Sequence, residues 1–473
     1  MISEAHIHAF YAMLDSKSVS TDQEEIEPHL HEWRDKFKGS SNLLLKPSSV
    51  QDVSRIVKYC NEHSLAIVPQ GGNTGLVGGG IAGLESKRAE IILSTKRIKN
   101  HIAVDDRDYS ITADAGYTVA ELETEATRFS RHFPLSLASE GSCTLGGIIS
   151  TNAGGVHVVR YGTTRDLILG IEAVLPNGEI FSDLSTLRKD NTGYDLKQLL
   201  IGAEGTLGII TKASMKLVPV ENNITTAWIA VQSAENALDI LSRVKEGFSE
   251  TLSAFEIMPL SGINMVLEHI EGTRPVLEGN HPWYILLELG TSSENTPLQT
   301  MLENKLADFI DAGLVEDAVI AKSISERADF WKLRESMSEA QKHEGGSIKH
   351  DISVPVAKVP EFLNIANEAI SKHFPDARPT PFGHLGDGNL HYNIMQPKDA
   401  DKATFLGEWQ RMNEIVHDIT VSFGGSISAE HGIGTLKKGE LSRLKPATEI
   451  AAMRAIKQAL DPNNIMNPGA LFI

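Results

Sequence analysis

Three glycine-rich loops in the first half of the chain constrain its fold more than any other feature. They span residues 69–80, 140–155 and 201–208, and each adjoins a short apolar run typical of a β-strand. Glycine has no Cβ, so backbone N–H groups in such loops can approach a ligand closely. Clustered N–H groups form a cradle for a pyrophosphate. One such loop is ordinary turn chemistry, but three of them predict a site for a large phosphorylated cofactor.

The elements predicted around the first loop follow β-α-β order. Residues 43–45 and 66–68 read as buried strands, and Ser49 between them reads as the N-cap of a helix with an apolar face. Further strands are expected at 91–93 and 111–113 and a helix at 119–130. Asn177-Gly178 between two apolar runs predicts a β-hairpin.

The pattern changes near residues 219–223, where glycine loops give way to regular strand-helix alternation. Strands are expected at 228–231, 253–257 and 284–288, and helices at 234–246 and 298–311. A last helix is expected at 448–460. We therefore expect a domain boundary near residue 220.

Charge and cysteine content limit the partners. The chain has 44 Lys plus Arg against 62 Asp plus Glu, a net charge of -18, which disfavours nucleic acid and anionic membranes. An anionic substrate would need local cations or a metal. The two cysteines, Cys60 and Cys143, cannot form a disulfide framework or an iron–sulfur cluster. Without a signal-peptide pattern or a membrane-spanning apolar run, a cytoplasmic protein is expected.

A candidate metal site lies in the second half of the chain. His384 and His391 flank a tight turn at 386–389, so a hairpin would bring their imidazoles side by side, with His391 and Asn393 on one face. The loop 428–434 places Glu430 beside His431. Two histidines and one glutamate are a typical ligand set for a borderline divalent ion. A hydrogen-bonded histidine of the core or surface is the competing interpretation, and chemistry alone leaves both open.

Two segments offer cations for an anionic ligand. Arg334 and Ser338 lie one turn apart on a helix expected over 331–338, and Lys349 lies on a strand expected over 347–352. Taken alone, each cation is better explained as a solvated surface charge.

The loop motifs, together with 151–155 and 187–198, resemble the FAD-linked oxidases of the vanillyl-alcohol-oxidase type, and more narrowly the D-2-hydroxyglutarate dehydrogenases among them. The resemblance extends from Trp33 to Pro468. It implies an α+β fold with a two-subdomain FAD-binding domain (1–220), an α+β substrate or cap domain carrying the metal site (221–425), and a C-terminal helical segment (426–473) that packs back on the first domain.

The resemblance also implies the residues that bind FAD. These are Pro69, Gln70, Gly71, Gly72, Asn73, Thr74, Gly75, Leu76 and Gly78 in the first loop, Gly141, Ser142, Cys143, Gly146, Gly147, Ser150, Asn152, Gly154 and Gly155 in the second, Glu204, Gly205, Gly208, Ile209 and Ile210 in the third, and Asn467. Some family members attach FAD through His or Cys. The first loop has neither, and Cys143 reads as a small packed hydrophobe, so noncovalent FAD is expected.

For the second half, the resemblance implies His384, His391 and Glu430 as ligands of Zn2+ or another divalent metal, and His431 as the general base. It implies Arg334, Ser338, Lys349 and Asn393, with His431, as the substrate contacts. One member of the family has Thr where this chain has Ser338, so the hydroxyl is retained but selectivity is open.

The implied reaction is FAD-dependent, metal-assisted oxidation of a D-2-hydroxy acid, foremost D-2-hydroxyglutarate to 2-oxoglutarate, by hydride transfer to flavin N5. An electron-transfer flavoprotein or a quinone is the expected acceptor, with a homodimer as one possible assembly. D-lactate or glycolate as substrate is the nearest alternative. A non-redox transferase like alkylglycerone-phosphate synthase, a flavin binder or a zinc hydrolase are further alternatives.

Overall fold

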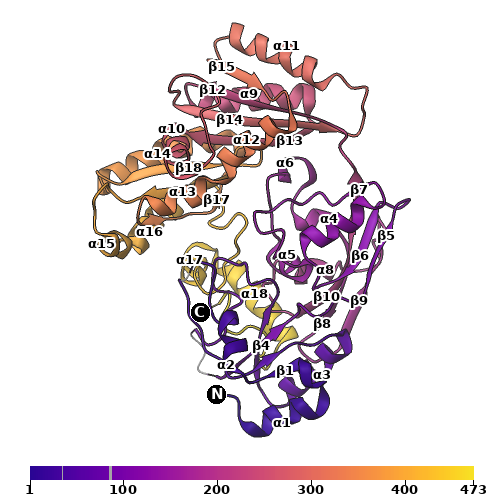
Figure 1. The fold of residues 1–473 in the computed structure, drawn as a ribbon. Helices are drawn as coiled ribbons and strands as arrows, with labels where there is room; N and C mark the ends of the chain where they lie inside the picture. Colours follow the sequence, from indigo (N-terminus) through magenta and orange to yellow (C-terminus); the bar gives the residue numbers. More distant parts are fainter. Residues whose placement is uncertain (35, 85–87, 473) are drawn as a thin grey trace. The chain divides into compact units, whose positions relative to one another are not determined.

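The computed structural model describes residues 1–34, 36–84 and 88–472, which form two compact units (Figure 1). Unit 1 comprises Met1–Gly155, Gly162–Pro219 and Glu430–Ile473, and unit 2 comprises Val156–Tyr161 and Val220–Ala429. The first domain was expected to run unbroken from 1 to 220. The short helix α6 (Val158–Tyr161) instead belongs to unit 2, because Val159 packs against the core of that unit.

Unit 1 contains two main sheets, as the expected two-subdomain arrangement requires. The first has the order β1-β2-β4-β3, in which β2, β4 and β3 run parallel. The second is antiparallel, with the order β5-β6-β10-β8-β9. The bounds are β1 (Val19–Ser20), β2 (Leu44–Leu45), β3 (Ala66–Gln70), β4 (Glu90–Ser94), β5 (Ile102–Asp105), β6 (Ser110–Asp114), β8 (Ile168–Val174), β9 (Ile180–Asp183) and β10 (Ile209–Lys216).

Local sequence explains how these elements begin and end. The Ser49 side chain accepts a hydrogen bond from the Asp52 backbone N–H and caps α3 (Val50–Glu62), as its position predicted. The buried face of α3, which includes Ile56 and Cys60, joins the core around the first sheet. Gly178, with φ +83, makes the turn between β8 and β9, so the predicted hairpin is confirmed.

The end of the chain completes the edge of the first sheet. The Ile67 N–H donates to the Ile465 carbonyl at 2.8 Å, and the Asn467 N–H donates to the Ile67 carbonyl at 2.8 Å. Residues 465–467 therefore continue the sheet beside β3, after the helices α17 (Lys438–Leu444) and α18 (Ala447–Leu460).

Unit 2 is built on one antiparallel sheet with the order β15-β12-β14-β13-β18-β19-β16, and β17 also pairs with β19. Its strands are β12 (Asn223–Val231), β13 (Leu252–Pro259), β14 (Trp283–Thr291), β15 (Asp317–Ile320), β16 (Ser347–Ile348), β17 (Ile352–Ser353), β18 (Arg378–His384) and β19 (Asn389–Met395).

Helices cover both faces of this sheet, so its central strands are apolar on both sides. Ile229 faces a core shared with α9 (Ala234–Phe248), α11 (Leu298–Asp311), α14 (Val359–His373) and α16 (Trp409–Ser422). Trp228 faces a second core shared with α10 (Leu260–His269), α12 (Ile324–Glu335) and α13 (Met337–His343). Successive residues of a strand point to opposite faces, so neighbouring positions serve different cores.

The fold class is therefore the expected α+β arrangement. Within the described part of the chain, no helix has the length and hydropathy needed to cross a membrane.

Candidate functional site

The first two glycine loops of unit 1 touch each other through their backbones. A Cβ on Gly71 would lie 2.4 Å from Thr144 Oγ1, and one on Gly72 would lie 2.1 Å from the Ser142 carbonyl oxygen. Only glycine permits this approach. At the start of the first loop, the Gln70 side chain donates to the carbonyls of His29 and Gly80 and holds the loop closed.

The second loop contains a helix that the sequence pattern did not predict, α5 (Leu145–Thr151). It begins after Thr144, whose Oγ1 is buried and has no hydrogen-bond partner among the described residues. It ends at Asn152 in the left-handed conformation, with φ +50. Cys143 is buried, and this burial raises the pKa of its thiol.

The third loop meets the first loop and the end of the chain. The Asn467 side chain donates to the carbonyls of Gly79 and Glu204, both at 2.8 Å. The Glu204 carboxylate accepts hydrogen bonds from the backbone N–H groups of Ile433 and Gly434, each at 2.7 Å. Sequence reasoning placed Glu204 and Asn467 near the cofactor but did not find these partners.

These loops fit a large phosphorylated cofactor. The buried Thr144 hydroxyl has no hydrogen-bond partner among the described residues and is available to a ligand. A Cβ on Gly75 or Gly141 would have no other atom within 4 Å, so space for a ligand exists at both positions. Three non-glycine residues of the loops adopt positive φ angles, and so does Asn467 near the end of the chain; such strain concentrates at ligand sites. The three loop residues are Asn73, Asn152 and Glu204. The expected FAD residues all lie on these three loops, on the following α5 and β10, or at Asn467.

In unit 2, the predicted hairpin consists of β18 and β19. The strands pair His384 with Asn389 and Phe382 with His391, so His384 and His391 lie diagonally on one face. Their ring centroids are 5.6 Å apart. The prediction that the turn brings the two imidazoles together is therefore correct.

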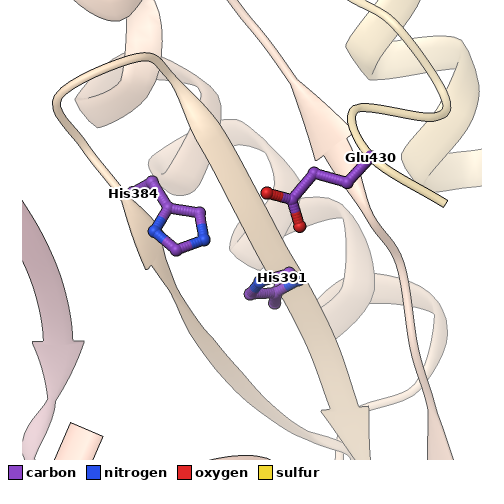
Figure 2. A group of neighbouring side chains, drawn as sticks. All are labelled: His384, His391 and Glu430. Carbon is purple, nitrogen blue, oxygen red and sulfur yellow. The ribbon is translucent and has the colours of Figure 1, made fainter. Parts of the chain in front are cut away.

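Glu430 directly follows Ala429, the last residue of unit 2, and its carboxylate points toward the two rings (Figure 2). Potential ligand atoms of His384, His391 and Glu430 all lie within 4.8 Å of one another, and so do those of Asp351, Glu430 and His431. Two imidazoles and a carboxylate at this spacing fit a divalent ion such as zinc. His431 is thus next in sequence to one candidate ligand and close to Asp351.

A buried glutamate that sequence reasoning missed supports this cluster. Glu256 on β13 accepts a hydrogen bond from His384 Nδ1 at 2.7 Å through one oxygen, and from Arg334 Nε at 2.7 Å through the other. Burial opposes ionisation, but the neighbouring His384 and Arg334 keep the pKa of Glu256 below its ordinary value. In the sequence, this role was indicated by the position of Glu256 within an otherwise apolar run.

Of the five expected substrate contacts, His431 lies in the part of unit 1 that begins at Glu430. The other four lie in unit 2, and two of the elements expected to carry them differ from those observed. Arg334 and Ser338 do not share a helix, because Ser336 separates α12, which ends at Glu335, from α13, which begins at Met337. Lys349 is not on a strand but between β16 and β17, where its Nζ donates to the Ser338 carbonyl at 3.3 Å. Arg334 is buried and stacks over the ring of Phe382 at 4.9 Å.

Asn393 has a neighbour that the sequence did not indicate. Its Nδ2 donates to Gln341 Oε1 at 2.8 Å, and both side chains are buried. Asn393 Oδ1 and Gln341 Nε2 have no hydrogen-bond partner among the described residues. One free acceptor and one free donor therefore remain for a polar ligand.

Comparison with known families accounts for most of the chain. Residues 220–471 match the model of the "FAD linked oxidases, C-terminal domain", and residues 41–183 match the model of an FAD binding domain.

Several curated relatives resemble the chain over nearly its whole length. The mitochondrial D-2-hydroxyglutarate dehydrogenase of Arabidopsis thaliana is 40% identical over 97% of this chain and 80% of its own length. The mitochondrial enzyme of the same name from Danio rerio is 37% identical, with coverages of 99% and 85%. The D-2-hydroxyglutarate dehydrogenase of Stutzerimonas stutzeri (strain A1501) is 34% identical over 100% of both chains.

Two solved structures share the fold. Alkyldihydroxyacetonephosphate synthase has a TM-score of 0.75 at 19% identity, covering 99% of this chain and 86% of the other. Substrate-bound p-cresol methylhydroxylase has a TM-score of 0.75 at 16% identity, covering 100% and 98%. The expected cytoplasmic location, by contrast, is overturned, because the Arabidopsis and Danio relatives are named mitochondrial enzymes.

Proposed function

Because this chain belongs to the FAD-linked oxidases and, within them, to the D-2-hydroxyglutarate dehydrogenase family, we propose that it oxidises D-2-hydroxyglutarate to 2-oxoglutarate with the help of a divalent metal. The observation that carries the proposal is the link through Glu256, which contacts both a candidate metal ligand, His384, and a candidate substrate arginine, Arg334.

FAD would be held by the three glycine loops and Asn467. When bound, it supplies a hydride acceptor, flavin N5, for the hydrogen on the substrate C2. The cofactor would be noncovalent. Cys143 is the cysteine of these loops, and its buried thiol, with a raised pKa, is a poor nucleophile for a covalent link.

His384, His391 and Glu430 would hold the metal. A bound divalent ion supplies a Lewis acid that lowers the pKa of the substrate's C2 hydroxyl. His431, next to Glu430, would accept the hydroxyl proton as the general base. Its neighbour Asp351 could stabilise the imidazolium that results.

Arg334, Lys349, Ser338 and Asn393 would hold the substrate. The side-chain cations of Arg334 and Lys349 suit the distal carboxylate of a dicarboxylic acid, which an acidic chain would otherwise repel. The free donor of Gln341, beside Asn393, adds a further candidate contact. Fixing the substrate through its far end would orient C2 before reaction.

Electrons would leave to an external acceptor, such as an electron-transfer flavoprotein or a quinone. The chain's two cysteines cannot hold an iron–sulfur cluster of their own. The homodimer stays a prediction.

Anaerobic bleaching of the flavin across a panel of D- and L-2-hydroxy acids tests the proposal. We expect D-2-hydroxyglutarate to bleach the flavin fastest and L-2-hydroxyglutarate not to bleach it. Faster bleaching by D-lactate or glycolate would assign a different hydroxy acid, and the absence of bleaching by every acid would favour a non-redox transferase.

A further inference from the structure

Glu256 uses both of its carboxylate oxygens inside unit 2. Oε1 accepts from His384 Nδ1, and Oε2 accepts from Arg334 Nε and pairs with Arg334 Nη2, each at 2.7 Å. The Glu256 side chain has an exposed fraction of 0%, so water does not compete for these bonds.

The sheet itself sets this geometry. Strands β13 and β18 pair in the register that places Glu256 directly opposite His384. Arg334 reaches the same carboxylate from α12, which packs on that face of the sheet. One carboxylate at a single strand position therefore contacts both the histidine and the arginine.

Each hydrogen bond to Glu256 determines which atoms of its partner side chain remain for another ligand. When His384 donates its Nδ1 hydrogen to a carboxylate, the lone pair of Nε2 is left to bind a metal, and the ring cannot turn. When Arg334 binds the same carboxylate through Nε and Nη2, its remaining N–H groups are left for a ligand.

Stability alone does not explain a carboxylate at this position. Every residue of β13 is buried, and apolar residues of similar size generally stabilise such a site as well as an ion pair does. We propose that Glu256 is a positioning residue that orients His384 toward the metal and Arg334 toward the substrate through one shared carboxylate. The inference rests on the proposed function.

The chain provides a matched control. Glu344 pairs with His269 Nε2 and with Arg378 Nη1, both at 2.8 Å, which is the same set of three residue types in the same unit. His269 and Glu344, with Glu268, also form a group of potential metal ligands. Glu344→Gln thus tests both the general cost of breaking such a triad and zinc binding away from His384.

The experiment compares flavin-loaded full-length wild type, Glu256→Gln, Glu344→Gln and His384→Ala. Zinc affinity is measured by competition with a chromophoric chelator, and kcat and KM for D-2-hydroxyglutarate are measured at saturating zinc. Flavin absorbance and thermal unfolding report on the fold. Glu256→Asp, which keeps the charge and shortens the side chain, serves if Glu256→Gln does not fold.

We expect Glu256→Gln to bind zinc about 10–100-fold more weakly, as loss of a partner behind a metal ligand generally does. We expect its KM to stay several-fold raised at saturating zinc, because Arg334 is also released. Flavin content should not change, and Glu344→Gln should match wild type in zinc affinity and KM.

Two results would overturn this inference and leave the proposed function standing. One is wild-type zinc affinity and KM in Glu256→Gln while His384→Ala loses zinc. The other is equal losses in Glu256→Gln and Glu344→Gln. A wild-type chain whose zinc binding does not depend on His384 would instead refute the metal site of the proposed function, and the inference with it.

Discussion

The carboxylate of Glu204 binds the backbone N–H of Ile433, 229 positions further along the chain, at 2.7 Å. Its second oxygen binds the N–H of Gly434. Gly432 comes so near that a Cβ there would lie 2.8 Å from Glu204 Oε1. The third glycine loop therefore holds the segment that follows Glu430 and His431, within unit 1.

Glu204→Gln should loosen this segment. The amide replaces one acceptor oxygen with an NH2 group that faces a backbone donor, so one hydrogen bond is lost and a donor is left unsatisfied. The free energy of unfolding should fall by about 1–3 kcal/mol, and kcat should fall because His431 is no longer held. Glu121→Ala is the control, since it removes the acceptor of the capping box of α4 (Val119–Thr127) elsewhere in unit 1. Equal kcat losses in both variants would show that lost stability, not loop position, reduces turnover.

Glu430→Ala, or treatment with a chelator, should abolish turnover and leave the flavin spectrum nearly unchanged. The proposed metal ligands and the glycine loops come from different segments, so metal loss should not empty the FAD site. Metal content by atomic emission, read beside flavin absorbance, checks this expectation. Glu268→Gln should retain the metal, because Glu268 belongs to the separate group around His269. Full activity in a metal-free preparation would exclude a catalytic metal.

Arg334→Ala should lower kcat/KM for D-2-hydroxyglutarate by one to several orders of magnitude, since removing one partner of a desolvated charge pair costs about 2–5 kcal/mol. D-lactate, which lacks the distal carboxylate, should be affected much less. Arg327→Ala is the control on the same helix, because Arg327 forms a comparable ion pair with buried Glu288. Steady-state kinetics with an artificial dye as acceptor measures both substrates. An equal loss on both would mean that Arg334 contacts the shared 2-hydroxy-acid head.

The stability of unit 2 should depend on pH through Glu288. Burial opposes ionisation of this carboxyl, but Arg327, Trp331 and Thr226 hold its pKa below the ordinary value. A lowered pKa in the folded state means that the stabilisation is present above the ordinary carboxyl pKa of about 4.3 and is lost as the pH falls through the folded value.

Glu288→Gln should therefore destabilise unit 2 by about 3–5 kcal/mol at pH 7 and by less at pH 3. Urea unfolding followed by tryptophan fluorescence at both pH values measures the difference. A loss of the same size at pH 3 would mean that packing, not the charge, accounts for the effect.

Local signals in the sequence were enough for many elements of the fold. Ser49 marked the start of α3, and the predicted helix over 298–311 has the observed bounds of α11. The helix α5 was missed because its sequence is rich in Gly, Ser and Thr, which have low intrinsic helix preference. Its helical form depends on packing against β10, a contact that no local pattern reveals.

In the site, too, the contacts between residues close in sequence were predictable and the contacts between distant residues were not. The turn between His384 and His391 is local, so alternation along two strands was enough to pair the imidazoles. Glu256 is 128 positions away from His384 and meets it only through the register of β13 with β18. The break at Ser336 was also hidden, because the residues around it have ordinary helix preferences.

The pairing of Ile67 with Ile465 and Asn467 has a consequence for synthesis on the ribosome. The strand edge of β3 emerges early, but its partner emerges nearly a whole chain later, a delay of roughly 20–80 s at ~5–20 residues per second. All of unit 2 is translated within that interval. The nascent chain must therefore keep an unpaired strand edge protected while the inserted unit is translated, and the first sheet is completed only after α18 has been made.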